Sequence, residues 1–220
     1  MKSRNYNQFC ALAVALDVVG ERWSLLIIRE LLPGPRRFKD LIVGLSGIST
    51  NLLSERLKCL EQKGILCRRV LPPPAGSTVY ELTAAGQALE TAVLELGRWG
   101  SRRLPTSLDG VALPSLGAIS LAIKAFFHPE QVQGIDETYE LRFGAEALQV
   151  QIKEGELQVR QGQALKPAAV LHTDMQSFLR LFTGQIQADE AIAGGLIRVE
   201  GDPGALRQFL SVCRVPGPQS

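Results

Sequence analysis

Small polar side chains gather in the first turns of one segment whose apolar residues are spaced as in a helix. Leu53, Leu57 and Leu60 fall on one face of this segment, and Ser49 precedes it as an N-cap, where its hydroxyl accepts from a backbone N–H. Hydrogen-bonding groups in the first turns of a helix reach base edges when the helix lies in a major groove. The residues predicted to make such contacts are Ser49, Thr50, Asn51, Ser54 and Lys58.

Segments on either side of this helix complete a recognisable unit. Apolar residues recur at helical spacing over residues 38–45, which predicts a first helix before the polar one, and residues 11–19 and 23–32 are predicted to be supporting helices. Gly64 suits a left-handed helix end, and residues 65–70 and 78–82 read as strands joined by the proline-rich turn of residues 71–77. A helix, a turn, a second helix and a hairpin together predict a winged helix.

Five arginines in and around this unit are candidates for contacts to DNA phosphates. A guanidinium group is always charged and matches the geometry of a phosphate. Two of them precede the first helix, one lies on the second helix and two lie on the hairpin, or wing: Arg36, Arg37, Arg56, Arg68 and Arg69. Simple solvation is the alternative for each surface arginine, and an internal salt bridge is a further alternative for Arg56.

Between Cys10 and Gly100, characteristic residues follow one another in a fixed order. They are Cys10, Gly20-Glu-Arg-Trp23 leading into SLLIIREL, Gly34-Pro-Arg-Arg-Phe38, Ile48-Ser49, SERLKCLEQKGIL, Tyr80-Glu-Leu-Thr83, Gly86 and Trp99-Gly100. In this combination the segment resembles the HxlR family of bacterial winged-helix transcription regulators, although Ala11 stands where that family often has proline. The resemblance implies a regulator that binds double-stranded DNA.

A long helix is predicted over residues 84–103, capped by Thr83. One stripe of this helix carries Leu89, Val93, Leu96 and Trp99 and needs a partner. The resemblance implies that terminal helices form a homodimer, which would place two recognition helices about one DNA turn apart on a roughly palindromic site. Packing of the stripe against the C-terminal part of the same chain is the alternative.

Cys10 is a candidate redox sensor, because the resemblance includes regulators that sense oxidants or electrophiles with a cysteine at this position. Lys2 and Arg4 are close in sequence and would favour the thiolate if they approach it in space. An inert buried thiol is the alternative. Cys59 and Cys67 are predicted to be core residues. The cysteines form no C-x-x-C pair and each histidine stands alone, so no metal site or disulfide framework is indicated.

Charge divides the 220 residues into two parts. Up to Pro105 there are 15 Lys and Arg against 9 Asp and Glu, whereas the remainder has 9 against 13. The basic part contains the predicted winged helix and would attract phosphates, and the acidic part would be repelled by a duplex. We predict a DNA-binding and dimerisation domain over residues 1–104, a linker rich in proline and glycine over residues 105–115, and a second domain over residues 116–214.

Alternation of apolar and polar residues predicts a sheet in the second domain. The pattern indicates strands over residues 138–143, 147–153, 156–161, 168–172 and 196–200, and helices over residues 116–127, 174–182, 189–193 and 205–213. Such a mixture gives an α+β domain with an antiparallel or mixed sheet. The whole chain is therefore predicted to be of the α+β class, with a winged helix-turn-helix domain first.

A short motif precedes the last predicted helix. Its residues are Gly195, Val199, Glu200, Gly201 and Asp202. With them, the stretch from about Leu116 to Arg214 resembles the sterol carrier protein type 2 family, which implies an apolar cavity between sheet and helices that holds a lipid or another apolar molecule. The candidate cavity residues are Phe126, Phe143, Phe178, Phe182, Ile186, Ile192, Leu196 and Phe209. Ordinary core packing is the alternative for each of them.

No nucleophile elbow, P-loop, dinucleotide fingerprint, metal-ligand cluster or pair of catalytic carboxylates is present, so we predict neither an enzyme nor a cofactor. We predict a dimeric transcription regulator, a repressor because steric blocking requires only tight binding, with a domain that senses an apolar ligand. The alternative is a carrier of lipids or other apolar ligands whose winged helix mediates protein association. Without a membrane-length apolar run or an export signal, the protein is predicted to be cytoplasmic, with no membrane partner.

Overall fold

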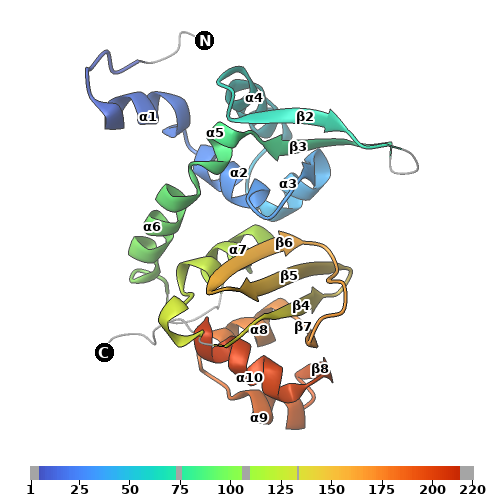
Figure 1. Ribbon diagram of the computed structural model, residues 1–220. Helices are drawn as coiled ribbons and strands as arrows, with labels where there is room; N and C mark the ends of the chain where they lie inside the picture. Colours follow the sequence, from blue (N-terminus) through green and yellow to red (C-terminus); the bar gives the residue numbers. More distant parts are fainter. Residues whose placement is uncertain (1–4, 73–75, 106–109, 133, 214–220) are drawn as a thin grey trace. The chain divides into compact units, whose positions relative to one another are not determined.

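The computed structural model describes residues 5–72, 76–105, 110–132 and 134–213 (Figure 1). By their internal contacts the residues form two compact units, Met1–Val93 and Leu94–Ser220. The division falls within helix α6 (Glu90–Ser101). The boundary at residue 104 that the composition indicates stays a prediction, and part of the predicted linker, residues 106–109, lies outside the described residues.

The first unit is a winged helix, as predicted. Before α6, this unit contains α1 (Ala11–Val19), α2 (Ser24–Leu31), β1 (Arg36–Arg37), α3 (Phe38–Gly44), α4 (Thr50–Gln62), β2 (Leu66–Val70), β3 (Thr78–Leu82) and α5 (Ala84–Gln87). The strands form an antiparallel sheet in the order β1-β3-β2. The short strand β1 was not predicted, and it pairs Arg36 with Tyr80 on β3.

Leucines and isoleucines from three helices form the core of this unit. Those with at most 2 % of their surface exposed are Ile27, Ile28 and Leu31 of α2, Leu41 of α3, Leu45 at its end, and Leu53, Leu57 and Leu60 of α4. Helix α4 begins where predicted, because the Ser49 hydroxyl accepts a hydrogen bond from the Leu52 N–H at 3.3 Å. After α4 ends, Gly64 adopts a left-handed conformation with φ of 69°.

The single helix predicted over residues 84–103 is instead two helices, α5 and α6, separated by a turn at Ala88 and Leu89. In this turn the Leu89 N–H bonds to the Gly86 carbonyl, three residues back rather than four. Thr83 caps α5, since its hydroxyl accepts from the Gly86 N–H at 3.2 Å. A Cβ atom on Gly86 would lie 2.1 Å from the carbonyl oxygen of Ile65. The close approach of α5 to the start of β2 therefore requires glycine.

Replacing Gly86 with alanine is expected to destabilise the first unit by about 3 kcal/mol, because the new methyl group meets backbone that cannot move aside cheaply. Gly100 of α6 is the matched control, because a Cβ atom there meets nothing within 4 Å. Gly100→Ala is expected to stabilise the protein by about 0.5 kcal/mol through helix propensity. Urea unfolding followed by circular dichroism measures both; equal stabilities for the two variants would contradict the account of Gly86.

The second unit contains a five-stranded sheet and several helices, as predicted. Its elements after α6 are α7 (Leu116–Ala125), the 3-10 helix η1 (Pro129–Gln131), β4 (Glu137–Phe143), β5 (Glu146–Lys153), β6 (Glu156–Gln161), β7 (Ala169–Thr173), α8 (Met175–Phe182), α9 (Ala188–Ala193), β8 (Ile197–Gly201) and α10 (Pro203–Val212). The strand order is β6-β5-β4-β7-β8 (Figure 1). The sheet is mixed, since β4 and β7 run parallel and the other neighbours antiparallel.

One face of this sheet, which we call the inner face, belongs to the apolar core. Tyr139 and Leu141 of β4 share it with Val150 of β5 and Leu171 of β7, and helices α7, α8, α9 and α10 add further core side chains. The outer face carries polar residues, among them Glu140, Arg142, Gln149, Gln151, Gln158, Arg160, His172, Arg198 and Glu200. The period-two alternation in the sequence therefore separates a buried from a solvated face.

The motif at the end of the sheet has a structural explanation. Gly201 has a φ of 92°, and a Cβ atom there would lie 2.4 Å from the Ala168 carbonyl oxygen. The next residue, Asp202, caps α10, because its carboxylate accepts from the Gly204 N–H at 2.7 Å. Gly201 and Asp202 thus direct the chain from β8 into α10.

Candidate functional site

The polar face of α4 is open to solvent, as a surface that reads DNA must be. Thr50, Asn51, Ser54 and Lys58 are all exposed, and their α4 neighbours Leu53 and Leu57 are buried. Within the described part of the chain, no hydrogen bond or ion pair engages these four side chains, so their polar groups are available to a ligand. Ser49 is exposed as well, but its hydroxyl is used as the helix cap.

Two of the predicted phosphate contacts are corrected by the structure. Arg36 lies on β1 and is only 5 % exposed, so its guanidinium is not at the surface where a phosphate would bind. Arg56 forms ion pairs with Glu21 at 3.0 Å and Glu55 at 3.2 Å, and its Nε donates to the Arg22 carbonyl at 3.2 Å. The alternative of an internal salt bridge therefore holds for Arg56, which joins α4 to the segment before α2. Arg37 is half-buried at the start of α3.

The arginines of the wing are exposed but paired with carboxylates of the same unit. Arg68 on β2 forms an ion pair with Glu61 at 2.9 Å, and Arg69 forms one with Glu81 of β3 at 2.8 Å. The hydrogen bond from Arg69 holds the pKa of Glu81 below its usual value. The pKa of the Cys67 thiol is raised, mainly by burial and next by the negative charge of Glu81. A phosphate would have to compete with these carboxylates for both guanidinium groups.

Replacing Glu81 with glutamine is expected to increase affinity for any DNA duplex about three-fold, because it frees Arg69 and removes a negative charge from the wing. The gain should be the same for related and unrelated sequences and should decrease with added salt. Glu95→Gln is the control, since Glu95 pairs with Arg98 on α6 rather than on the wing. Fluorescence anisotropy with two unrelated duplexes measures the effect; unchanged affinity would show that Arg69 makes no phosphate contact.

Helix α1 is attached to the end of α4 by a lysine that sequence reasoning missed. The Lys63 ammonium group donates to the backbone carbonyls of Asp17 and Val18 in the last turn of α1, with the Val18 bond at 3.2 Å. A lysine that caps a helix 45 residues earlier leaves no local sequence signal. The attached helix exposes apolar side chains, because Leu12, Val14 and Leu16 of α1 are exposed and so is Phe9 before it.

The stripe predicted along residues 84–103 is divided in the structure. Val93 is buried, but Leu96 and Trp99 of α6 are more than half exposed. On another side of α6, the Arg98 Nε donates to the Ala125 carbonyl at the end of α7 at 2.7 Å. Arg98 thus connects α6 to α7, while Leu96 and Trp99 present apolar surface, so dimerisation through this stripe stays a prediction.

Most residues predicted to line an apolar cavity belong to the core of the second unit. Phe178, Phe182 and Phe209 are buried; the Phe178 ring lies 5.4 Å from Phe182 and 5.4 Å from Phe143 between centroids. Four more candidates pack against the same core: Phe126, Phe143, Ile186 and Ile192. Leu196 is corrected, since it is 38 % exposed and lies outside this core. The candidates therefore come together in one apolar cluster between sheet and helices.

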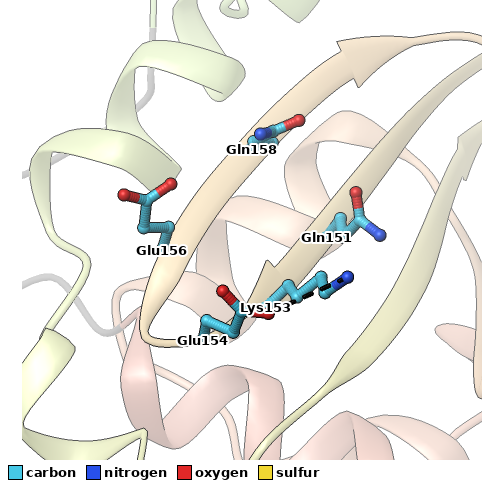
Figure 2. A pocket seen from close by; sticks show the side chains of 5 residues that line it. All are labelled: Gln151, Lys153, Glu154, Glu156 and Gln158. Atoms are coloured by element: carbon cyan, nitrogen blue, oxygen red, sulfur yellow. Dashed lines mark ion pairs between the residues drawn. The ribbon is translucent and has the colours of Figure 1, made fainter.

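A hollow of about 180 Å³ lies at the outer face of the sheet and is polar (Figure 2). It is lined by Gln151 and Lys153 of β5, Gln158 and Glu156 of β6, and Glu154 in the turn between the strands. Amides and charged groups of this kind do not bind an apolar molecule. This hollow is therefore a different feature from the cluster of aromatic residues on the inner face.

The four cysteines, all in the described part of the chain, differ in exposure. Cys10 is exposed, Cys59 and Cys67 are half-buried, and Cys213 is buried, which raises its pKa to about 12. Lys2 and Arg4, proposed neighbours of Cys10, lie outside the described residues. Over residues 5–72, 76–105, 110–132 and 134–213, there is no group of three or more potential metal-ligating side chains, and no helix is long and apolar enough to cross a membrane.

A helix-turn-helix with an antiparallel wing and an exposed polar second helix defines the winged-helix class of DNA-binding domains. Residues 18–107 match the family described as HxlR-like helix-turn-helix. The chain is 41 % identical over 88 residues to the HTH-type transcriptional regulator YodB of Bacillus subtilis, covering 40 % of this chain and 79 % of that protein. It belongs to the HxlR-like helix-turn-helix family, and its N-terminal domain is that of a transcriptional regulator.

Two further comparisons concern the N-terminal domain, and a third concerns the C-terminal domain. The uncharacterized regulator YvaP of Bacillus subtilis is 38 % identical over 96 residues, which cover 43 % of this chain and 89 % of YvaP. The solved reduced form of YodB is 37 % identical with a TM-score of 0.39, covering 46 % of this chain and 99 % of that one. Residues 124–214 match the SCP-2 sterol transfer family, which confirms the resemblance seen in the sequence.

Proposed function

We propose that the protein is a dimeric repressor that binds a pseudo-palindromic DNA site and responds to an apolar ligand in its C-terminal domain. The observation that carries the DNA-binding part is the exposed polar face of α4, formed by Thr50, Asn51, Ser54 and Lys58. Beside it stand the exposed cations of the wing, Arg68 and Arg69. Such a surface supplies base-edge contacts from the helix and phosphate contacts from the hairpin.

Dimerisation is supported by the apolar surface of α1. A protein seldom exposes several large apolar residues together unless another surface covers them. Leu12 and Leu16 lie one helical turn apart on the same face of α1, and Phe9 precedes them. A second copy of the same helix would cover this face in an isologous contact, and the dimer would present two α4 helices to two half-sites.

The ligand response rests on the match of residues 124–214 to a family named for sterol transfer. The chain's core there gathers Phe143, Phe178 and Phe182 between the sheet and α8, which is a suitable environment for an apolar molecule. A ligand that binds one conformation of the protein better than another shifts the equilibrium between them, and so changes DNA affinity.

Mobility-shift titration tests the regulator function against the alternative of an apolar-ligand carrier. The probe is the DNA flanking the protein's own gene, the control is a shuffled duplex of equal length, and the salt concentration is varied. A regulator is expected to retain the first duplex at least about 10³-fold more tightly than the second, with affinity falling steeply in salt. Equal, weak binding of both duplexes would favour the carrier, in which the winged helix mediates protein association.

Cys10 is proposed as a second switch, because it is the exposed member of the four cysteines in the described chain. Exposure makes its thiol accessible to peroxide or to quinone. DNA release on oxidant treatment is expected in the wild-type protein and is expected to be lost in Cys10→Ser, with Cys59→Ser as the control. Release that persists in Cys10→Ser would overturn this role.

A further inference from the structure

An exposed cation that the sequence analysis did not single out lies beside α4. Arg22 belongs to the segment between α1 and α2, and within the described part of the chain its guanidinium group forms no ion pair. The five arginines predicted to contact phosphates are instead buried, half-buried or paired with a carboxylate. An exposed arginine without a carboxylate partner can bind a phosphate without first losing another contact.

Two contacts hold Arg22 next to the N-terminal half of α4. Its backbone carbonyl accepts a hydrogen bond at 3.2 Å from the Nε atom of Arg56, in the second turn of α4. Its guanidinium carbon lies 5.3 Å from the centroid of the Trp23 ring. That ring reaches the turn between α3 and α4, since a Cβ atom on Gly47 would lie 3.9 Å from its Cη2 atom. The guanidinium group is therefore held on the side of α4 from which the helix begins and where Asn51 lies.

The backbone of this segment is strained at Trp23. Its φ of 81° and ψ of −20° are in the left-handed region, which a bulky side chain rarely adopts. Strain of this kind persists only where surrounding contacts impose it, and it is concentrated at functional sites. In this conformation the Trp23 ring lies under the Arg22 guanidinium group. A cation already held over an aromatic face loses less freedom when it binds an anion.

Arg56 engages the two carboxylates that flank this segment. It pairs with Glu21, the residue before Arg22, at 3.0 Å and with Glu55 at 3.2 Å. Without Arg56, the Glu21 carboxylate would lose its partner and would attract the neighbouring guanidinium group. Arg56, which the structure excludes as a free phosphate contact, is thus placed to keep Arg22 available and to join it to α4.

We propose that Arg22 binds a backbone phosphate of the DNA duplex at the edge of the groove that α4 enters, and that Arg56 is its positioning residue. The N–H groups of Arg22 donate to the phosphate oxygens while the Trp23 ring supports the guanidinium plane. A phosphate carries no base identity, so this contact sets affinity and the register of α4 rather than base preference. The inference rests on the proposed DNA-binding function and adds to it a contact from the segment before α2.

Fluorescence anisotropy with the full-length protein tests the proposal, using the DNA flanking its own gene and a shuffled duplex over about 50–200 mM salt. Arg22→Gln is expected to weaken binding to both duplexes about five-fold and to make the dependence of log affinity on log salt shallower by about one. Arg22→Lys keeps the charge, and is expected to keep the wild-type salt dependence and to lose about two-fold or less in affinity.

The matched control is Arg103→Gln, because Arg103 is also exposed and lies over a tryptophan, 4.1 Å from the centroid of the Trp99 ring in the second unit. It removes the same charge and the same kind of ring contact, and is expected to change affinity by less than about two-fold. Arg22→Gln is expected to unfold within about 2 °C of the wild type. A markedly lower unfolding temperature with an unchanged salt dependence would show a purely structural role and would overturn the proposal.

A double variant tests the role of Arg56. Arg56→Gln alone is expected to weaken binding to the shuffled duplex, and to weaken it no further when Arg22→Gln is already present. Losses that add in the double variant would show that Arg56 acts independently of Arg22, and would refute its positioning role.

The outcomes separate this inference from the function on which it depends. If the wild-type protein binds neither duplex, the DNA-binding function fails and the inference fails with it. If the wild type binds but Arg22→Gln leaves affinity and salt dependence unchanged, or if Arg103→Gln changes them as much, the DNA-binding function stands and the role of Arg22 is refuted.

Discussion

A protein in which Leu12 and Leu16 are both replaced by aspartate is expected to be monomeric and to lose more than about 100-fold in affinity for its DNA site. Both leucines lie on one exposed face of α1, where two like charges would repel the same face of a second copy. In a dimer, binding of one half-site makes binding of the second intramolecular, which raises affinity by about 10²–10⁴-fold. A monomer loses this gain.

Sedimentation velocity and mobility shift on the same samples measure the effect. Val43→Asp is the control, because Val43 on α3 is also a highly exposed apolar residue but does not lie on α1. It is expected to leave the sedimentation coefficient unchanged. A double aspartate variant that still sediments as a dimer would place the interface elsewhere, with Leu96 and Trp99 of α6 as the next exposed apolar residues to test.

Asn51→Ala is expected to weaken binding to the cognate site about 5- to 150-fold while leaving affinity for unrelated DNA unchanged. The exposed amide of Asn51 lies in the first turn of α4 and can donate to and accept from one base edge, which is worth about 1–3 kcal/mol of discrimination. Loss of this contact relaxes preference at one position of the site.

Arg69→Gln is the matched comparison, because its side chain lies on the wing. It is expected to lower affinity for cognate and unrelated duplexes alike and to reduce the salt dependence. Selection from a randomised half-site, followed by sequencing, distinguishes the two. A uniform loss for Asn51→Ala, without a change in the selected sequence, would contradict base contact by this residue.

The sequence predicted secondary structure well wherever apolar spacing is regular. The predicted bounds of α1 and β3 coincide with the observed ones, and Ser49 caps α4 as expected. The spacing of apolar residues did not predict the elements that depend on tertiary contacts. The two arginines of β1 show no strand alternation of their own and pair because β3 is beside them. The periodic stripe continues through residues 88 and 89, so it gave no sign of the turn between α5 and α6.

The candidate site was predictable in part for a similar reason. The polar face of α4 follows from helical geometry alone, and its four exposed residues were found in this way. Charged partners distant in the sequence could not be predicted in this way, because Arg56 and its partner Glu21 are separated by 35 residues. Apolar rings look alike in a packed core and around a ligand, so the sequence named the cluster around Phe178 without deciding between the two.

The attachment of α1 to α4 through Lys63 would affect the spacing between half-sites that the protein prefers. The ammonium group joins the proposed subunit contact to the far end of the helix that carries Asn51, the end away from the bases. Any movement of α1, whether from oxidation of Cys10 or from a partner copy, would therefore act on α4 at its C-terminal end through these two hydrogen bonds. The preferred number of base pairs between half-sites would change first, and the identity of the bases recognised within each half-site would not.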